Sequence, residues 1–135
     1  MMEYVEKIVI DGKVLAIVMR KNFNKLGCNF VTPIDLTFQL GVHIEKSGTH
    51  IKAHKHIPFK ELKEVYPQEF FYVEYGKIEV GIHNENNIHK KVILSEGDMI
   101  LLNCPHEVKL LEDSKFLELK QGPYRGKDAE KEYLI

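Results

Sequence analysis

Histidines are the residues of this sequence whose spacing most clearly predicts chemistry. The chain has seven of them, and His50, His54 and His56 fall within seven consecutive positions. Because His54 and His56 are two residues apart, both imidazoles project from one face of an extended strand, whereas on a helix they diverge by about 200 degrees. In a β-rich chain this pair can therefore chelate one metal ion.

Two more residues extend the pair to a set of four metal ligands. Glu69 opens a run whose same-face residues are apolar, and a carboxylate there carries a desolvation penalty unless a cation or a donor meets it. His106 follows Pro105 after an apolar strand, where a turn aims its ring inward. Three imidazoles and a carboxylate suit a divalent transition metal (iron, manganese, nickel, zinc or copper), whereas calcium and magnesium prefer oxygen ligands. The sequence thus predicts one metal ion per chain, held by His54, His56, Glu69 and His106.

The elements that must position these ligands have the pattern of β-strands. Apolar and polar residues alternate over residues 36–45 and over residues 70–82, with a break at Gly76, and a period of two is typical of strands. Asp11 and Gly12 form a two-residue hairpin turn between apolar runs. Further short strands are expected at residues 92–94, 99–102, 108–111 and 116–119. Their roughly ten-residue spacing indicates an all-β sandwich or barrel.

Three segments depart from simple alternation. Residues 20–33 are polar and rich in turn formers, which predicts a loop. Residues 59–66, bounded by Pro58 and Pro67, can form a short helix. Residues 99–102 are apolar on both faces and are expected to be buried on both sides, either between sheets or against another subunit. We therefore expect a homodimer.

Composition excludes several classes of protein. The 135 residues fit one domain, and 44% apolar with 29% charged residues are typical of a folded chain. The net charge is -1 and basic residues are interspersed with acids, so neither nucleic acid nor a membrane is an expected partner. The amino terminus lacks the pattern of a signal peptide, which predicts a cytoplasmic protein. Cys28 and Cys104 form no CxxC pair, and we expect both thiols to be buried or idle.

The remaining histidines are weaker candidates for ligands. His43 and His50 are expected to face solvent or to lie near the centre without binding the metal. His83 and His89 flank a polar hairpin loop, and both are expected to be exposed.

The metal-ligand pattern carries a family resemblance. The run from Gly48 to Gly76 resembles the first motif of the cupin superfamily, G-x5-H-x-H-x3-4-E-x6-G, with His54, His56 and Glu69 between the two glycines. The stretch GDMILLNCPH resembles the second motif, G-x5-P-x-G-x2-H-x3-N. It keeps the leading glycine and the histidine but lacks the P-x-G pair and the trailing asparagine.

This resemblance implies a fold and a domain layout. Cupins are jelly-roll β-barrels, also called double-stranded β-helices, and are often dimeric. Their metal lies inside the barrel on three histidines and one glutamate, which here are His54, His56, Glu69 and His106. The resemblance covers about residues 36–120 of a single domain that spans residues 1–135, with residues 121–135 as a C-terminal tail.

The spacing within the first motif is unusual. Residues 57–68, twelve in all, lie between His56 and Glu69, where the family has three or four. Glu61 fits the spacing from the histidines, whereas Glu69 fits the spacing to Gly76. We favour Glu69 because it begins a strand of fixed register, while Glu61 lies among lysines in an expected solvated helical turn. Residues 57–68 are then an insertion at the mouth of the barrel.

Four ligands on a six-coordinate ion leave two positions open for water, dioxygen or substrate oxygens. Such a centre can polarise a carbonyl, stabilise an enolate or bring dioxygen to a substrate. The sequence predicts a metal-dependent enzyme for a small oxygenated molecule, either a dioxygenase or a sugar or keto-acid isomerase. A non-catalytic metallo-cupin that binds a small ligand and a metal-free structural jelly roll remain alternatives. Candidates for a general base, which the sequence does not rank, are His43, Tyr72, Tyr75 and Glu61.

Overall fold

The computed structural model describes residues 2–57, 66–85, 87–121, 125–126, 129, 132 and 134. The chain divides into two compact units. The first combines Met1–Phe23 with Pro67–Ile135, and the second is Asn24–Tyr66. All regular elements of the described residues are β-strands, in agreement with the expected all-β class.

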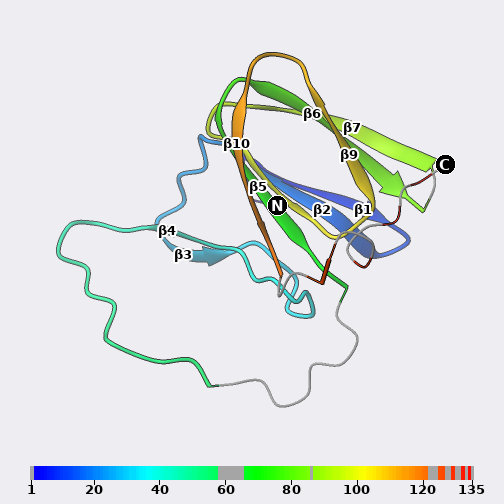
Figure 1. The fold of residues 1–135 in the computed structure, drawn as a ribbon. Coiled ribbons are helices and arrows are strands. Elements are labelled where there is room, and N and C mark those ends of the chain that lie inside the picture. Colours follow the sequence, from blue (N-terminus) through cyan, green and yellow to red (C-terminus); the bar gives the residue numbers. More distant parts are fainter. Residues whose placement is uncertain are drawn as a thin grey trace. The chain divides into compact units, whose positions relative to one another are not determined.

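The described residues of the first unit form eight strands in two antiparallel sheets (Figure 1). The five-stranded sheet has the order β1-β2-β8-β5-β10, and the three-stranded sheet has the order β7-β6-β9. The strands are β1 (Val5–Ile10), β2 (Lys13–Met19), β5 (Glu69–Tyr75), β6 (Lys77–Asn84), β7 (Asn87–Ser95), β8 (Met99–Leu102), β9 (His106–Leu110) and β10 (Lys115–Lys120). Among the described residues these sheets remain separate and do not close into a barrel.

The predicted turns form where their residues allow the required backbone. Asp11 and Gly12 both have positive φ and join β1 to β2, as a two-residue hairpin turn requires. Gly76 has φ +93° and separates β5 from β6. A Cβ at Gly76 would lie 2.2 Å from Ser114 Oγ, so only glycine fits this bend. The break predicted at Gly76 is therefore confirmed.

One hydrophobic core lies between the two sheets of the first unit. Residues alternate along β6, so that Ile78, Val80 and Ile82 all face this core and are fully buried. The cluster comprises Ile8, Leu15, Ala16, Val18, Phe71, Val73, Ile78, Val80, Ile82, Val92, Leu94, Ile100 and Leu102. Both sheets contribute to it, which makes the unit a two-layer β arrangement.

β8 is buried on both faces, as its sequence predicts. It lies between β2 and β5 in the five-stranded sheet, and Ile100, Leu101 and Leu102 are at most 2% exposed in the single chain. The chain itself completes this burial, so β8 gives no reason to require a second subunit. The expected homodimer remains a prediction without this support.

Within its described residues, the second unit has a hairpin formed by β3 (Gly27–Phe30) and β4 (Gly41–Ile44). The prediction of a loop over residues 20–33 was therefore wrong for β3, which is a strand. The strand predicted over residues 36–45 is limited to β4. The Gln39 amide donates hydrogen bonds to the carbonyls of Pro33 and Leu36, and Thr32 Oγ donates to Gln39 Oε1. These bonds fold the segment before β4 into turns despite its alternating sequence.

Two expected segments lie largely outside the described residues. Of the expected helix over residues 59–66, only Tyr66 lies within the described residues, and it has no regular secondary structure. Of the tail, residues 121–135, too few are described to test the expectation. No helix among the described residues has the length and apolar character needed to cross a membrane.

Candidate metal centre

Glu69 and His106 meet at one end of the first unit. Glu69 is the first residue of β5 in the five-stranded sheet, and His106 is the first residue of β9 in the three-stranded sheet. His106 Nε2 lies 3.0 Å from Glu69 Oε2, and both side chains are about four-fifths buried. Two predicted ligands that are 37 residues apart are therefore in direct contact.

The protonation of His106 follows from its two partners. Nδ1 donates a hydrogen bond to the Cys104 carbonyl at 2.9 Å, so this nitrogen carries a proton. Nε2 faces the Glu69 carboxylate, which is an acceptor when ionised. Burial alone lowers the pKa of His106, but the hydrogen bonds to Glu69 and the Cys104 carbonyl raise it overall. The raised pKa favours the imidazolium form of His106, in which Nε2 donates to the Glu69 carboxylate.

The pKa of Glu69 moves in the opposite direction. The hydrogen bond from His106 lowers this pKa, against the opposing effect of burial. The charge of His106 lowers it further. A carboxylate that stays ionised while largely buried retains the lone pairs that a metal ligand needs.

Packing and hydrogen bonds fix this corner of the unit. The Phe71 ring contacts His106 edge-on, with ring centroids 5.9 Å apart. Gln68 is 3% exposed, and its side-chain amide donates to Asn103 Oδ1 at 3.0 Å. Asn103 Nδ2 in turn donates to the Val14 carbonyl. These contacts anchor the residue before Glu69 to β2, a role that the sequence reading missed because one polar residue before a strand gives no signal.

His54 and His56 belong to the second unit, where both are exposed. They lie beyond the end of β4 without regular structure, so the expectation that a strand carries them was wrong. Their rings are nevertheless adjacent, with centroids 5.3 Å apart in an edge-on arrangement. His54 Nδ1 donates to the Lys52 carbonyl at 2.7 Å.

His54 and His106 share one local arrangement that the motif did not predict. In each, Nδ1 donates to the backbone carbonyl two residues earlier, Lys52 for His54 and Cys104 for His106. This bond fixes the tautomer and leaves Nε2 as the nitrogen available to a metal. Metal-bound histidines commonly hold their second nitrogen in this way.

The four predicted ligands thus form two pairs, each described within its own unit. Glu69 and His106 meet in the first unit, and His54 and His56 are neighbours in the second. Within the described part of the chain, no three side chains of His, Cys, Asp or Glu form a group that could hold a metal ion. Glu61, the other candidate for the carboxylate ligand, lies outside the described residues.

His83 is more buried than its sequence position predicts. It was expected to be exposed but is 7% exposed, so this prediction was wrong. Its Nε2 lies 3.2 Å from Glu107 Oε2, and its Nδ1 has no hydrogen-bond partner among the described residues. The Glu107 side chain lies against Gly81, which has no side chain to displace it. His89 is exposed, as expected.

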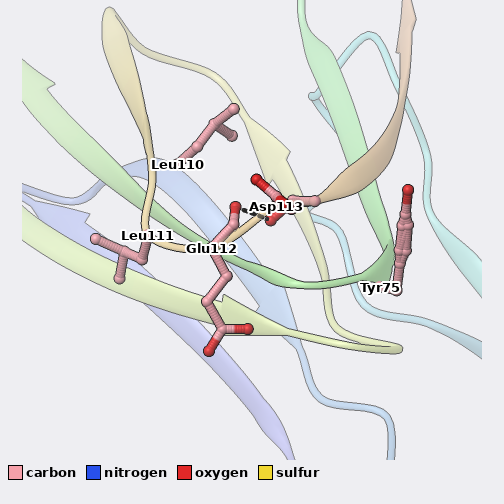
Figure 2. Close-up of a pocket in the computed structure, with 6 residues that line it drawn as sticks. Tyr75, Leu110, Leu111, Glu112 and Asp113 are labelled. Atoms are coloured by element: carbon pink, nitrogen blue, oxygen red, sulfur yellow. Dashed lines mark hydrogen bonds between the residues drawn. The ribbon is translucent and has the colours of Figure 1, made fainter.

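A shallow surface pocket lies at the opposite end of β5 and β9 from the Glu69–His106 pair (Figure 2). Tyr75 ends β5, and the loop between β9 and β10 forms the other side of the pocket. In this loop Ser114 Oγ donates a hydrogen bond to the Glu112 carbonyl. The lining residues are Tyr75, Leu110, Leu111, Glu112, Asp113 and Ser114. None of them is a predicted metal ligand.

Comparisons of the chain with protein-family models, with curated proteins and with solved structures gave no significant match. Any functional assignment therefore depends on the residues and contacts described above.

Proposed function

We propose that this chain is a metal-binding cupin. His54, His56, Glu69 and His106 hold one divalent transition metal, and the metal-bound protein acts on a small oxygenated molecule. The observation that carries the proposal is the contact between Glu69 and His106, which come from different sheets and meet at 3.0 Å.

The separation of these two atoms suits a shared metal ion. The Nε2 nitrogen of His106 and a carboxylate oxygen of Glu69 are donor types that would hold one divalent transition metal when they lie close together. These two atoms lie 3.0 Å apart. To bind an ion, His106 would give up its Nε2 proton, so metal binding would release a proton.

The tautomers of two histidines also support the proposal. In both His54 and His106, Nδ1 donates a hydrogen bond to a backbone carbonyl. This leaves Nε2 of each ring to bind the ion. His56 follows His54 at two residues, and the contact between their rings keeps the second imidazole beside the first. Three nitrogens and one carboxylate oxygen make a donor set for iron, manganese, nickel, zinc or copper.

The strand order of the first unit supports the jelly-roll part of the proposal. All strand pairs are antiparallel, and strands distant in sequence are neighbours: β8 lies between β2 and β5, and β9 pairs with β6. Two facing antiparallel sheets with such long connections are typical of jelly rolls. A jelly roll places the start of β5 and the start of β9 at one end, where Glu69 and His106 are.

A bound metal with open positions supplies Lewis acidity and a template for substrate oxygens or dioxygen. The residues of the chain then have distinct tasks. Glu69 contributes negative charge that lowers the net charge of the centre, and the Cys104 carbonyl orients the His106 ring. Phe71 places an apolar ring beside His106. A dioxygenase and a sugar or keto-acid isomerase both fit this arrangement, and a non-catalytic metallo-cupin is the second candidate.

Metal-dependent stabilisation tests the proposal. Metal-free protein is melted alone and with each of Fe²⁺, Mn²⁺, Ni²⁺, Zn²⁺ and Cu²⁺, because an ion that binds only the folded chain raises Tm. The Tm is expected to rise for at least one of these ions, and the rise is expected to disappear in His106→Ala. His89→Ala is the matched control, since His89 is an exposed histidine outside the proposed set. The absence of any rise, or an equal rise in His106→Ala, contradicts the proposal.

A further inference from the structure

A second cluster of reactive side chains lies on the hairpin of the second unit. The inference drawn from this cluster does not depend on the proposed metal centre. Cys28 on β3 and His43 on β4 are directly opposite each other in the antiparallel register. Residues opposite each other in such a pair project from the same face. Cys28 Sγ lies 3.6 Å from His43 Nε2, within the range of a hydrogen bond to sulfur.

Glu45 orients the ring from its other side. His43 Nδ1 lies 3.6 Å from Glu45 Oε1. A carboxylate near Nδ1 favours the tautomer with its proton on that nitrogen, which leaves the Nε2 lone pair toward the Cys28 thiol. A nucleophile, a base and an acidic group that orients the base are thereby aligned, which is the arrangement that activates nucleophilic thiols.

The strand holds the thiol at the surface. Cys28 is exposed, whereas its neighbour Asn29 is 7% exposed on the opposite face of β3. The Asn29 amide donates to the carbonyls of Lys25 at 2.8 Å and Gly27 at 3.2 Å. Because alternate residues face opposite sides of a strand, the fixed Asn29 keeps Cys28 outward. A reactant can therefore approach the sulfur from solvent.

Cys104 provides an internal contrast. Its side chain packs against the hydrophobic core of the first unit. Burial raises the pKa of the Cys104 thiol to about 11, which disfavours its reactive thiolate form. The two cysteines of the chain are thus placed very differently, and only Cys28 combines access with a base.

We infer that Cys28 is a site of covalent modification by small disulfides, activated by His43 and positioned through Glu45. Cys28 sulfur attacks one sulfur of the disulfide, and its proton passes to His43 Nε2. A new S–S bond joins Cys28 to half of the disulfide, and the original S–S bond breaks. The other half leaves as a thiolate, which takes up the proton from the imidazolium. One thiol and one disulfide are consumed and one of each is formed, so electrons and atoms balance.

The rate of reaction with 4,4′-dithiodipyridine tests this inference on the full chain, with EDTA present to exclude bound metal. One thiol is expected to react rapidly, and Cys28→Ser is expected to abolish this phase while Cys104→Ser leaves it unchanged. His43→Gln keeps a polar side chain but removes the base, so the rate at Cys28 is expected to fall by about tenfold or more. Circular dichroism checks that each variant retains the β fold.

Three results would overturn the inference. One is a Cys28 rate no greater than that of Cys104. Another is a His43→Gln rate within roughly twofold of the wild-type rate, since thiol access alone then explains the reaction. The third is a Cys28 rate no greater than that of a short cysteine peptide in the same buffer.

Glu45 needs a readout of its own, because it acts through His43 and is a positioning residue. The ¹⁵N chemical shifts of the His43 ring report which nitrogen carries the proton. In the wild type they are expected to show the proton on Nδ1, and in Glu45→Gln this preference and the thiol rate are expected to decrease together. An unchanged tautomer in Glu45→Gln would remove Glu45 from the array, even if the rate falls.

Discussion

The Glu69 carboxylate and the His106 imidazole form a 3.0 Å ion pair that links the first residue of β5 to the first residue of β9. The pair joins the two sheets of the first unit at one end and contains half of the predicted metal ligands. The same contact therefore has consequences for stability in the metal-free chain and for metal binding.

The stability of the metal-free chain is expected to depend on pH through this pair. The pKa of Glu69 is lowered from 4.5, so its contribution is present above about pH 4.5 and is lost as the pH falls through its lowered pKa. The pKa of His106 is raised from 6.5, so its contribution is present below about pH 6.5 and is lost as the pH rises through its raised pKa. The pair therefore stabilises most between these two values, by about 1–2 kcal/mol.

Urea unfolding of the wild type and of Glu69→Gln, both with EDTA, measures this dependence. The difference in free energy of unfolding is expected to be largest at about pH 5.5 and smaller at about pH 3 and about pH 9. A difference that stays constant over this range shows that the two groups do not form a charged pair.

Gly76→Ala is expected to destabilise the first unit strongly. Its φ is +93°, and an added Cβ would lie 2.5 Å from the Asp113 carbonyl oxygen as well as close to Ser114. Gly12→Ala is the matched control, because Gly12 also has positive φ but its added Cβ would meet nothing within 4 Å. We expect a loss of about 1–2 kcal/mol for Gly12→Ala and at least ~2 kcal/mol more for Gly76→Ala. Equal losses in denaturant unfolding would show that the close approach at Gly76 has no cost.

Asp98→Ala is expected to loosen the connection between β2 and β8. The Asp98 carboxylate accepts hydrogen bonds from Arg20 Nη1 at 3.0 Å, from the Ser95 amide at 2.9 Å and from the Lys21 amide at 3.2 Å. Its side chain is 13% exposed, so these donors lose a buried partner and the loss is about 2–4 kcal/mol.

Glu112→Ala serves as the comparison for Asp98→Ala. Glu112 pairs with Lys77 at 3.7 Å, but its side chain is 57% exposed. Exposed ion pairs contribute little, so its removal is expected to cost under ~1 kcal/mol in the same unfolding assay. Similar losses for the two variants contradict the assigned role of Asp98.

The choice of carboxylate ligand is tested by paired substitutions. Glu69 contacts His106, so Glu69→Ala is expected to weaken metal binding by about tenfold or more, while Glu61→Ala leaves it unchanged. Isothermal titration of the metal-free variants with the ion that binds best measures both affinities. The reverse result would make Glu61, in the insertion over residues 57–68, the carboxylate ligand.

The strand pattern of the first unit could be predicted from sequence because local rules act there without competition. Asp11 and Gly12 favour a two-residue turn, and Gly76 fits a bend that excludes a side chain. The burial of β8 also followed from its apolar sequence, although the sequence could not show that this burial is reached within a single chain.

The errors came from side-chain contacts between distant residues or within turns. Gln39 bonds to two carbonyls and ends the alternation before β4, which periodicity alone does not reveal. His83 is buried because Gly81 leaves room for Glu107 to cover it, and the register of β6 shifts next to it. The motif named Glu69 and His106 as ligands, but their direct contact depends on how the two sheets of the first unit pack against each other.

The metal content of the purified chain tests the central proposal most directly. After dialysis to remove loosely bound ions, elemental mass spectrometry is expected to find about one transition metal ion per chain in the wild type and in His89→Ala. The content is expected to fall to near zero in His54→Ala, His56→Ala, Glu69→Ala and His106→Ala. A wild type that holds no transition metal, or a wild-type metal content in all four variants, contradicts a metal centre built from these residues.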